Sequence, residues 1–292
     1  MTETPGAQFR ALLNEQEIVL AVGAYDAQSA RLVEQAGGDL VYASGSGISA
    51  SVHGGPDLGL TTMTEMVDRV RGMASAADVP VFSDADTGYG GALNVRRTVR
   101  EYERAGVAAV HIEDQTFPKR CGHFEGKGVV DREEMLARIR AATDAADDLV
   151  VCARTDAAAT EGLDAAIDRA RVCAEAGAEM LFVEAPETRA DLERVGEALG
   201  EYPLVANLTA GGKTPVIPAA ELAEMGFSVA LYPSAAQKAT IRILRRVYRE
   251  ILNEGTSEGI LDEIATWAER NEVTGLAEFE ALEEQYTRER ES

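Results

Sequence analysis

Short apolar runs alternate with amphipathic stretches along the chain from residue 18 onward. The runs are continuous, whereas a half-buried strand would alternate apolar and polar residues, and continuous runs are typical of strands that a parallel sheet buries on both faces. They are Ile18–Val22, Leu40–Ala43, Val79–Phe82, Ala108–Ile112, Leu149–Ala153, Met180–Val183, Leu204–Ala206 and Val229–Leu231. Between them lie segments with apolar residues at helical spacing, among them Asn94–Ala105, Arg132–Ala146, Leu163–Ala176 and Ala219–Met225.

Eight strand-and-helix units in a chain of 292 residues match a (β/α)8 barrel in both number and length. We therefore predict an α/β fold, a TIM barrel, over residues 1–254. A doubly wound sheet is the alternative, but no GxGxxG motif follows the first apolar run, where a dinucleotide-binding fold would carry it.

Beyond the barrel, Thr256–Glu269 and Leu276–Arg290 carry apolar residues in stripes at helical spacing, which predicts two further helices. The barrel already has its eight helices, so we predict that residues 255–292 form a helical arm for contacts between subunits. Packing of these helices on the outside of the same barrel is the alternative.

The charge balance is strongly acidic: 50 Asp and Glu face 28 Lys and Arg, and the net charge is −22. This charge argues against nucleic acid or an anionic membrane as a partner. The acidic residues are spread along the chain, and lysine occurs only at Lys119, Lys127, Lys213 and Lys238. Because salt screens the self-repulsion of such a surface, we hypothesise a halophilic source.

Three cysteines in a chain of this length do not form a disulfide framework, and no zinc-binding spacing is present. The first ten residues are polar and lack the apolar segment of a signal peptide, and no apolar run reaches the roughly 18 residues of a membrane span. We therefore expect a soluble cytoplasmic protein.

Polar and charged residues follow nearly every predicted strand. In a barrel the carboxyl ends of all strands meet at one rim, where active sites are built. The strand-end residues are Tyr25-Asp26, Ser44-Gly45-Ser46-Gly47, Asp84-Ala85-Asp86, Glu113-Asp114, Arg154-Thr155-Asp156, Glu184, Asn207-Leu208-Thr209 and Tyr232-Pro233-Ser234. Turns alone do not require so many charges, so we predict an active site there.

Four carboxylates, Asp57, Asp84, Asp86 and Glu113, are candidates for a metal site at this rim. Carboxylates at that density repel one another unless a cation joins them, and oxygen ligands without His or Cys point to Mg²⁺ or Mn²⁺. Mg²⁺ keeps several waters, so some of the four would reach it through water. A surface acidic patch is the alternative.

Other rim residues suit a small carboxylic acid. Ser44-Gly45-Ser46-Gly47 offers N–H groups and hydroxyls without bulk, Arg154 is a candidate for a bidentate carboxylate contact, and Asn207-Leu208-Thr209 supplies neutral donors. In Lys119-Arg120-Cys121-Gly122-His123 a thiol lies between cations and a histidine, which favours the thiolate. Such a thiol is either a nucleophile or an acid/base.

These motifs, in this order, resemble the isocitrate lyase/phosphoenolpyruvate mutase superfamily from about residue 10 to the C-terminus, with 2-methylisocitrate lyases the most similar members. The matching stretches are Tyr42-Ala43-Ser44-Gly45, Pro56-Asp57-Leu58-Gly59, Asp84-Ala85-Asp86-Thr87-Gly88-Tyr89-Gly90, His111-Ile112-Glu113-Asp114-Gln115, Lys119-Arg120-Cys121-Gly122-His123, Ala153-Arg154-Thr155-Asp156 and Asn207-Leu208-Thr209. The resemblance implies a helix-swapped homotetramer.

The resemblance also implies roles for individual residues. Asp86 would be the main direct Mg²⁺ ligand, and Asp57, Asp84 and Glu113 would reach the metal or its waters. The two halves of the substrate would be held by Ser44, Gly45, Ser46, Arg154 and Tyr42 on one side and by Gly122, His123, Asn207, Thr209 and Glu184 on the other. Cys121 would protonate the carbanion left by C–C cleavage, with Lys119 and Arg120 keeping its thiol acidic. The base for the substrate hydroxyl stays open between Tyr42 and a metal-bound water.

The implied reaction is cleavage of 2-methylisocitrate to pyruvate and succinate, and isocitrate is the nearest alternative substrate. The stretch Ala50–Gly54 resembles the corresponding stretch of enzymes that act on oxaloacetate or dimethylmalate. A phosphonate-forming mutase is a further alternative, but these mutases lack the cysteine found here at position 121. Phe124 and Ala210-Gly211-Gly212 depart from the pattern of 2-methylisocitrate lyases. Because residue 210 would lie by the distal end of the substrate, the identity of the acid stays open. A non-catalytic binding protein is the last alternative.

Overall fold

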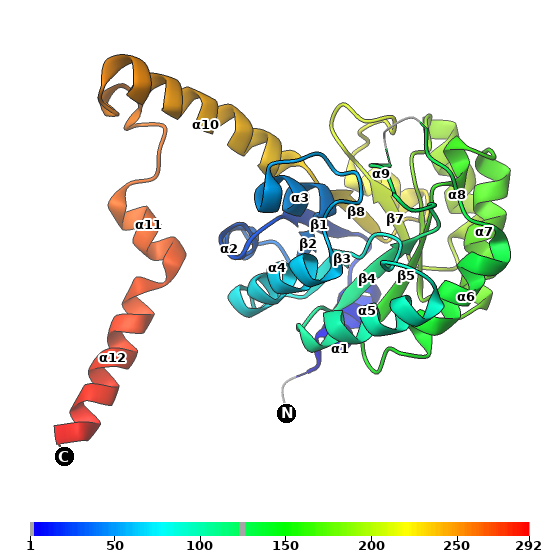
Figure 1. Ribbon diagram of the computed structural model, residues 1–292, viewed down its shortest axis with the longest axis horizontal. Coiled ribbons are helices and arrows are strands. Elements are labelled where there is room, and N and C mark those ends of the chain that lie inside the picture. Colours follow the sequence, from blue (N-terminus) through cyan, green and yellow to red (C-terminus); the bar gives the residue numbers. More distant parts are fainter. Residues whose placement is uncertain (1–2, 123–125, 292) are drawn as a thin grey trace. The chain divides into compact units, whose positions relative to one another are not determined.

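Eight parallel strands close into a barrel in the order in which they occur along the chain (Figure 1). The computed structural model describes residues 3–122 and 126–291. The closed barrel confirms the predicted fold and excludes the doubly wound sheet. The strands are β1 (Val19–Ala24), β2 (Leu40–Ala43), β3 (Val81–Asp84), β4 (Ala109–Glu113), β5 (Val150–Thr155), β6 (Met180–Val183), β7 (Leu204–Asn207) and β8 (Val229–Tyr232).

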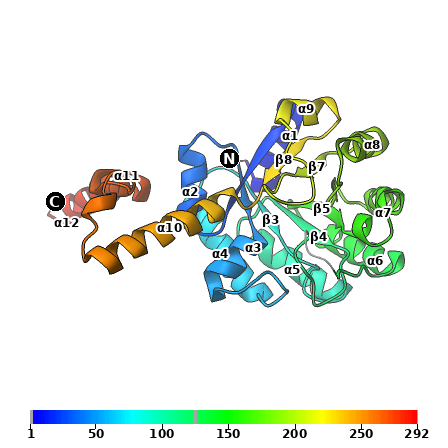
Figure 2. The ribbon, with the colours of Figure 1, turned by 90° about the horizontal axis from the view of Figure 1, so that it is seen from above.

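Helices surround the barrel, as the view from above shows (Figure 2). They are α2 (Ala27–Gln35), α3 (Gly45–His53), α4 (Met63–Ala76), α5 (Ala92–Arg104), α6 (Arg132–Thr143), α7 (Leu163–Glu175), α8 (Arg189–Leu199) and α9 (Ala219–Glu224). A further helix, α1 (Pro5–Glu15), precedes the first strand. Capping fixes several of their starts: Thr62 and Thr188, for example, each accept a hydrogen bond from the third residue of their helix.

Two apolar cores hold the barrel together. One lies between the strands and the surrounding helices, and the other fills the barrel interior. Helix α1 belongs to the second core, because its Phe9 is fully buried and stacks on Phe82 of β3 with ring centroids 6.0 Å apart. The apolar pattern does not predict α1, since Gly6 and Phe9 are its only buried residues.

The chain divides into two compact units, Met1–Ala236 and Gln237–Ser292. Helix α10 (Ala235–Glu254) buries none of its residues, and the division falls within its first turn, whereas the sequence pattern places the division at residue 254. The second unit continues with a short 3-10 turn (Glu258–Ile260), α11 (Trp267–Thr274) and α12 (Leu276–Glu291). No helix in the described part of the chain is long and apolar enough to cross a membrane.

The predicted helix over Thr256–Glu269 is wrong, whereas the one over Leu276–Arg290 agrees with α12. The reason is a strong helix start inside the predicted segment. Thr266 caps α11: its N–H donates to Glu269 Oε2 over 2.6 Å, and the Glu269 N–H donates to Thr266 Oγ1 over 3.2 Å. A capping box fixes a helix N-terminus, so the preceding residues belong to a separate turn.

Candidate active site

The predicted site residues gather at the rim formed by the carboxyl ends of the strands. Asp84 ends β3, Glu113 ends β4 and Asn207 ends β7, while Asp86 and Glu184 lie within two residues after their strands. Glu113 is in register with Arg154 of the neighbouring strand β5, so the barrel ladder itself brings these two side chains together. The backbone of Asp86 has a φ of 48°, which is uncommon for a residue other than glycine and is often found at functional sites.

Lys119 joins two of the predicted metal carboxylates. Its Nζ lies 2.6 Å from Asp57 Oδ1 and 2.6 Å from Asp86 Oδ1, and its side chain is only 3% exposed. Burial opposes the charge of this ammonium, but Asp86, Asp84 and Asp57 raise the pKa of Lys119 well above its ordinary value. Lys119 is therefore a fixed cation inside the carboxylate cluster.

The raised pKa values of the buried acids indicate that Lys119 alone does not neutralise the negative charge of the carboxylate cluster. Burial, with a smaller contribution from Asp84 and Asp57, raises the pKa of Asp86 to about 7. Burial also raises the pKa of Glu113 well above its ordinary value, although Arg154 Nε lies 3.3 Å from Glu113 Oε2. No described residue forms a hydrogen bond with Glu113 Oε1, which is buried. A buried acceptor without a donor favours a further cation at this place.

The donor set suits Mg²⁺. Within the described residues no three or more His, Cys, Asp or Glu side chains converge as a metal cage. Mg²⁺ does not need one, because it takes one or two direct carboxylates and keeps waters at its other positions. The all-oxygen set and the unpartnered Glu113 Oε1 therefore fit Mg²⁺ held largely through water, with Mn²⁺ as the chemically similar substitute.

The segment with Cys121 is anchored to this rim through its backbone. The Cys121 N–H donates to the carbonyl oxygen of Asp57 over 3.3 Å. The side chain of Gln115 makes two hydrogen bonds to the backbone of Arg120: Gln115 Nε2 donates to the Arg120 oxygen (2.8 Å), and the Arg120 N–H donates to Gln115 Oε1 (2.9 Å). The predicted substrate residue His123 lies outside the described residues.

Gly122 lies against two charged side chains. A Cβ atom at this position would be 2.5 Å from Arg154 Nη2 and 2.6 Å from Glu184 Oε1, closer than real Cβ contacts allow. Glycine is therefore required here because of close approach, with no contribution from an unusual φ. The contact brings the backbone next to Cys121 within reach of the predicted substrate groups.

Arg154, predicted to bind a substrate carboxylate, also forms ion pairs with buried carboxylates of the protein. Its Nε lies 2.9 Å from Asp156 Oδ2, and its Nη2 lies 3.3 Å from Asp156 Oδ1 and 3.6 Å from Glu184 Oε2. Although burial opposes its charge, Asp156, Glu184 and Glu113 raise the pKa of Arg154 well above its ordinary value. The guanidinium stays cationic, and Asp156 fixes its plane.

Two of the remaining predicted donors, Asn207 and Thr209, form a hydrogen-bonded chain that ends at Glu184. Asn207 Nδ2 donates to both carboxylate oxygens of Glu184 over 3.2 Å, and Thr209 Oγ1 donates to Asn207 Oδ1 over 3.1 Å. At the start of α3, Ser44 Oγ accepts from the Gly47 N–H over 3.3 Å. Gly45 allows the close approach of Asp84, whose Oδ2 would be 2.2 Å from a Cβ there. The second predicted serine, Ser46, has its Oγ 3.3 Å from Ser44 Oγ.

Tyr42 is held by His111, a residue to which the sequence reasoning assigns no role in the site. Tyr42 Oη and His111 Nε2 are 2.8 Å apart, and His111 Nε2 lies 3.8 Å from Asp84 Oδ1. Burial, with help from Asp84, raises the pKa of Tyr42 well above its ordinary value, so its phenol stays protonated. Burial lowers the pKa of His111 to about 4, so the imidazole is neutral near pH 7.

Sequence reasoning does not assign site roles to His111, Gln115, Lys127 or Asp156. His111 is a polar residue inside a predicted strand, and Asp156 follows a strand end, so both carry a signal in the sequence. Gln115 and Lys127 carry no such signal, because each of them makes contacts to the backbone of a loop whose course the sequence pattern does not predict.

Comparison with known proteins gives one consistent family. Residues 9–252 match the family model described as phosphoenolpyruvate phosphomutase. The chain is 43% identical over 282 residues to 2,3-dimethylmalate lyase of Eubacterium barkeri, covering 96% of this chain and 97% of the relative. It is 43% identical over 276 residues to 2-methylisocitrate lyase of Halalkalibacterium halodurans, covering 94% and 91%.

Comparison with solved structures leads to the same family. Oxaloacetate acetylhydrolase in complex with the inhibitor 3,3-difluorooxalacetate is 33% identical, with a TM-score of 0.93 over 97% of both chains. Phosphonopyruvate hydrolase in complex with oxalate and Mg²⁺ is 30% identical, with a TM-score of 0.88 over 98% of this chain and 100% of that one.

The fold and the site define a (β/α)8 barrel with a carboxylate-rich rim next to a cysteine and a buried arginine. The chain belongs to the phosphoenolpyruvate mutase/isocitrate lyase superfamily, as the resemblance of its motifs predicts.

Proposed function

We propose that the chain is an Mg²⁺-dependent oxo-acid lyase that cleaves 2-methylisocitrate to pyruvate and succinate, with Cys121 as acid/base. Relatives named as lyases, and a site rich in carboxylates and cations, support the reaction class. The observation that carries the proposal is the position of the Cys121 backbone. It is bonded to Asp57, a predicted metal carboxylate, and it precedes Gly122, which lies against Arg154 and Glu184.

Each residue then has a task that follows from its charge state. Arg154, a permanent cation, binds a substrate carboxylate, and protonated Tyr42 donates a hydrogen bond to the oxygen of the oxo-acid half. Bound Mg²⁺, reached through Asp86 and its neighbours, supplies Lewis-acid polarisation of the oxo-acid oxygens. The substrate hydroxyl gives up its proton to a base and becomes the oxo group of pyruvate. The electron pair of the broken C–C bond stays on the carbon next to the succinate carboxylate, and the Cys121 Sγ–H delivers its proton there.

Cys121→Ser tests the assignment. General acid catalysis contributes about 10²–10⁴-fold, so turnover falls by that factor while binding of succinate is unchanged. Formation of pyruvate from 2-methylisocitrate with Mg²⁺ measures turnover, and calorimetric titration with succinate measures binding. Nearly full turnover of the serine variant would refute the role of Cys121, and no oxo-acid product from wild type with any candidate acid would refute the lyase.

2,3-Dimethylmalate is the second candidate substrate, because a 2,3-dimethylmalate lyase is as similar to the chain as the 2-methylisocitrate lyases are. The Ala50–Gly54 stretch is the sequence feature that agrees with it, and Ala210 departs from the pattern of 2-methylisocitrate lyases. The ratio of kcat/KM for the two acids decides between them. A higher kcat/KM for 2,3-dimethylmalate would replace the substrate without changing the reaction class.

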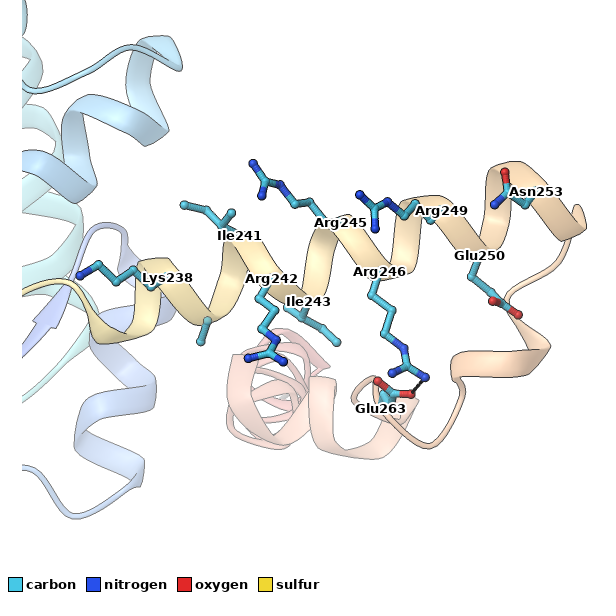
Figure 3. A pocket seen from close by; sticks show the side chains of 11 residues that line it. Lys238, Ile241, Arg242, Ile243, Arg245, Arg246, Arg249, Glu250, Asn253 and Glu263 are labelled. Carbon is cyan, nitrogen blue, oxygen red and sulfur yellow. Dashed lines mark ion pairs between the residues drawn. The ribbon is translucent and has the colours of Figure 1, made fainter. Parts of the chain in front are cut away.

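We propose that the C-terminal unit mediates assembly into a homotetramer. Helix α10 buries none of its residues, and Tyr248 and Leu252 are 56% and 83% exposed. Figure 3 shows basic side chains that project from two sides of this helix, Lys238, Arg242, Arg245, Arg246 and Arg249, in an otherwise acidic protein. Arg246 already pairs with Glu263 of the same unit.

An apolar and basic helix of this kind suits an interface with an acidic surface of a second copy. Analytical ultracentrifugation of wild type and of Leu252→Asp measures the assembly. We expect tetramers for wild type and smaller species for the variant. A monomeric wild type would refute the arm.

A further inference from the structure

Lys127 is a buried cation that no step of the proposed mechanism uses. Its side chain is 1% exposed, and its Nζ lies 2.7 Å from Asp156 Oδ1. The same Nζ also donates to the carbonyl oxygen of Gly122. One ammonium therefore connects a loop carbonyl to a carboxylate that follows β5.

Asp156 is a rigid support for this contact. Its side chain is fully buried and bonded to Arg154, and its backbone N–H donates to Asp114 Oδ1 over 2.8 Å. Although burial opposes ionisation, Arg154 and Lys127 lower the pKa of Asp156 to about 2, so the carboxylate is charged at any working pH. Charge-assisted hydrogen bonds between such buried partners are stronger than neutral ones.

The carbonyl that Lys127 holds belongs to the residue directly after Cys121. On the other side of the cysteine, Gln115 holds both backbone polar groups of Arg120. The Cys121-Gly122 backbone is thus fixed from both directions, by an amide before the thiol and by an ammonium after it. With Gly122 pressed against Arg154 and Glu184, a shift of its carbonyl would also move the thiol relative to the substrate groups.

We propose that Lys127 is a positioning residue for the proton transfer: its ammonium ties the Gly122 carbonyl to the Asp156 carboxylate and thereby fixes the direction of the Cys121 thiol. The proposal rests on the proposed function of Cys121. Lys127 touches no reacting atom in it and acts through the backbone of the loop. Misplacement of a catalytic group by about 1 Å costs about 10²-fold in rate, which sets the size of the effect.

The test uses Lys127→Met, which keeps the length and apolar stem of the side chain and removes its charge and donors. The measurement is exchange of succinate C–H hydrogen with D₂O on the enzyme with Mg²⁺ and without pyruvate, so that no C–C bond can form, followed by NMR. This exchange reports the proton transfer of Cys121 without C–C cleavage. We expect exchange and kcat to fall by about 10²-fold and KM to change less than threefold, because the ion pair of Arg154 with Asp156 remains.

Two further variants separate positioning from folding. Lys127→Arg keeps the charge and should recover at least a tenth of the exchange rate, and Lys127→Gln keeps a neutral donor and should lie between Met and Arg. Arg71→Met removes an exposed ion pair with Asp68 and should match wild type. If Lys127→Met does not fold, the test rests on the exchange rates of the other two variants, which should be higher for Lys127→Arg than for Lys127→Gln.

Exchange by folded Lys127→Met within twofold of wild type overturns the proposal, and so does an equal loss in all three Lys127 variants. A rise in KM with kcat unchanged also overturns it, because Lys127 would then act on binding alone. The absence of any turnover by wild type overturns the lyase function and this proposal with it. Loss of exchange in Lys127→Met beside an active wild type supports both.

Discussion

Acidification should destabilise the barrel through His111, a buried histidine of strand β4. Its side chain is 0% exposed and packs on the rings of Tyr42, Phe82 and Phe182. Burial lowers the pKa of His111 from 6.5 to about 4. As the pH falls below 6.5, the unfolded chain binds a proton that the folded protein does not. The contribution of His111 to stability is therefore complete above pH 6.5 and is lost as the pH falls toward 4.

The size of the effect follows from the two pKa values. A shift of one unit corresponds to about 1.4 kcal/mol, so the full loss at pH 4 is about 3 kcal/mol. At pH 5 the unfolded histidine is almost fully protonated and the folded one is not, which gives about 2 kcal/mol. For a chain of this size that corresponds to a change in Tm of about 4–8 °C.

His111→Gln removes the titrating group and keeps a polar partner for the Tyr42 hydroxyl. Urea unfolding of wild type and variant at pH 7.5 and pH 5, above the pI of about 4.5, gives the free energy of unfolding of each. The stability difference between the two proteins should shift by about 2 kcal/mol in favour of the variant on going to pH 5. The comparison with the variant is needed because Asp114, whose pKa burial raises to about 6, acts in the opposite direction.

His53→Gln, which removes an exposed histidine, is the matched control. A stability difference between wild type and His111→Gln that is the same at both pH values would refute the reasoning, because His111 would then titrate equally in the folded and unfolded chains.

Three further variants or conditions test other parts of the structure. Gly122→Ala places a methyl group 2.5 Å from Arg154 Nη2, so kcat should fall by at least tenfold while circular dichroism is unchanged; normal kcat would contradict the close contact. Glu113→Gln removes the carboxylate with an unpartnered oxygen, so calorimetry should show Mg²⁺ affinity about 10–100-fold weaker, and equal affinity would exclude Glu113 from the metal site. If the acidic composition reflects adaptation to salt, Tm should rise steadily with KCl up to molar concentrations, and full stability at low salt would refute the halophilic hypothesis.

The strand pattern is the part of the structure that the sequence predicts best. All eight apolar runs overlap the eight strands, because strands buried on both faces leave a continuous apolar signal. Boundaries differ by one or two residues for a physical reason: Glu113 and Thr155 continue their strands through backbone hydrogen bonds although their side chains are polar. Helix α1 leaves almost no apolar signal, because it buries little besides Phe9.

The site is predictable only as far as the strand ends determine it. Parallel strands bring residues such as Asp84, Glu113 and Arg154 to one rim whatever the loops do, so residue type and position suffice to find them. The course of a loop, in contrast, leaves no repeating pattern of apolar and polar residues in the sequence. Nothing in the spacing of Lys119 or Lys127 shows that one reaches Asp86 and the other a backbone carbonyl.

If the rim binds Mg²⁺ as proposed, its charges link metal binding to proton release. Among the residues described above, three cations face six carboxylates, and the six are Asp57, Asp84, Asp86, Glu113, Asp156 and Glu184. Burial and repulsion between carboxylates raise the pKa values of Asp86 and Glu113. Protons bound to these two acids therefore offset part of the excess negative charge. A dication offsets it as well and competes for the same oxygens. The proposed Mg²⁺ would therefore displace protons from these two acids, and we expect its apparent affinity to rise with pH through about 7, the pKa of Asp86.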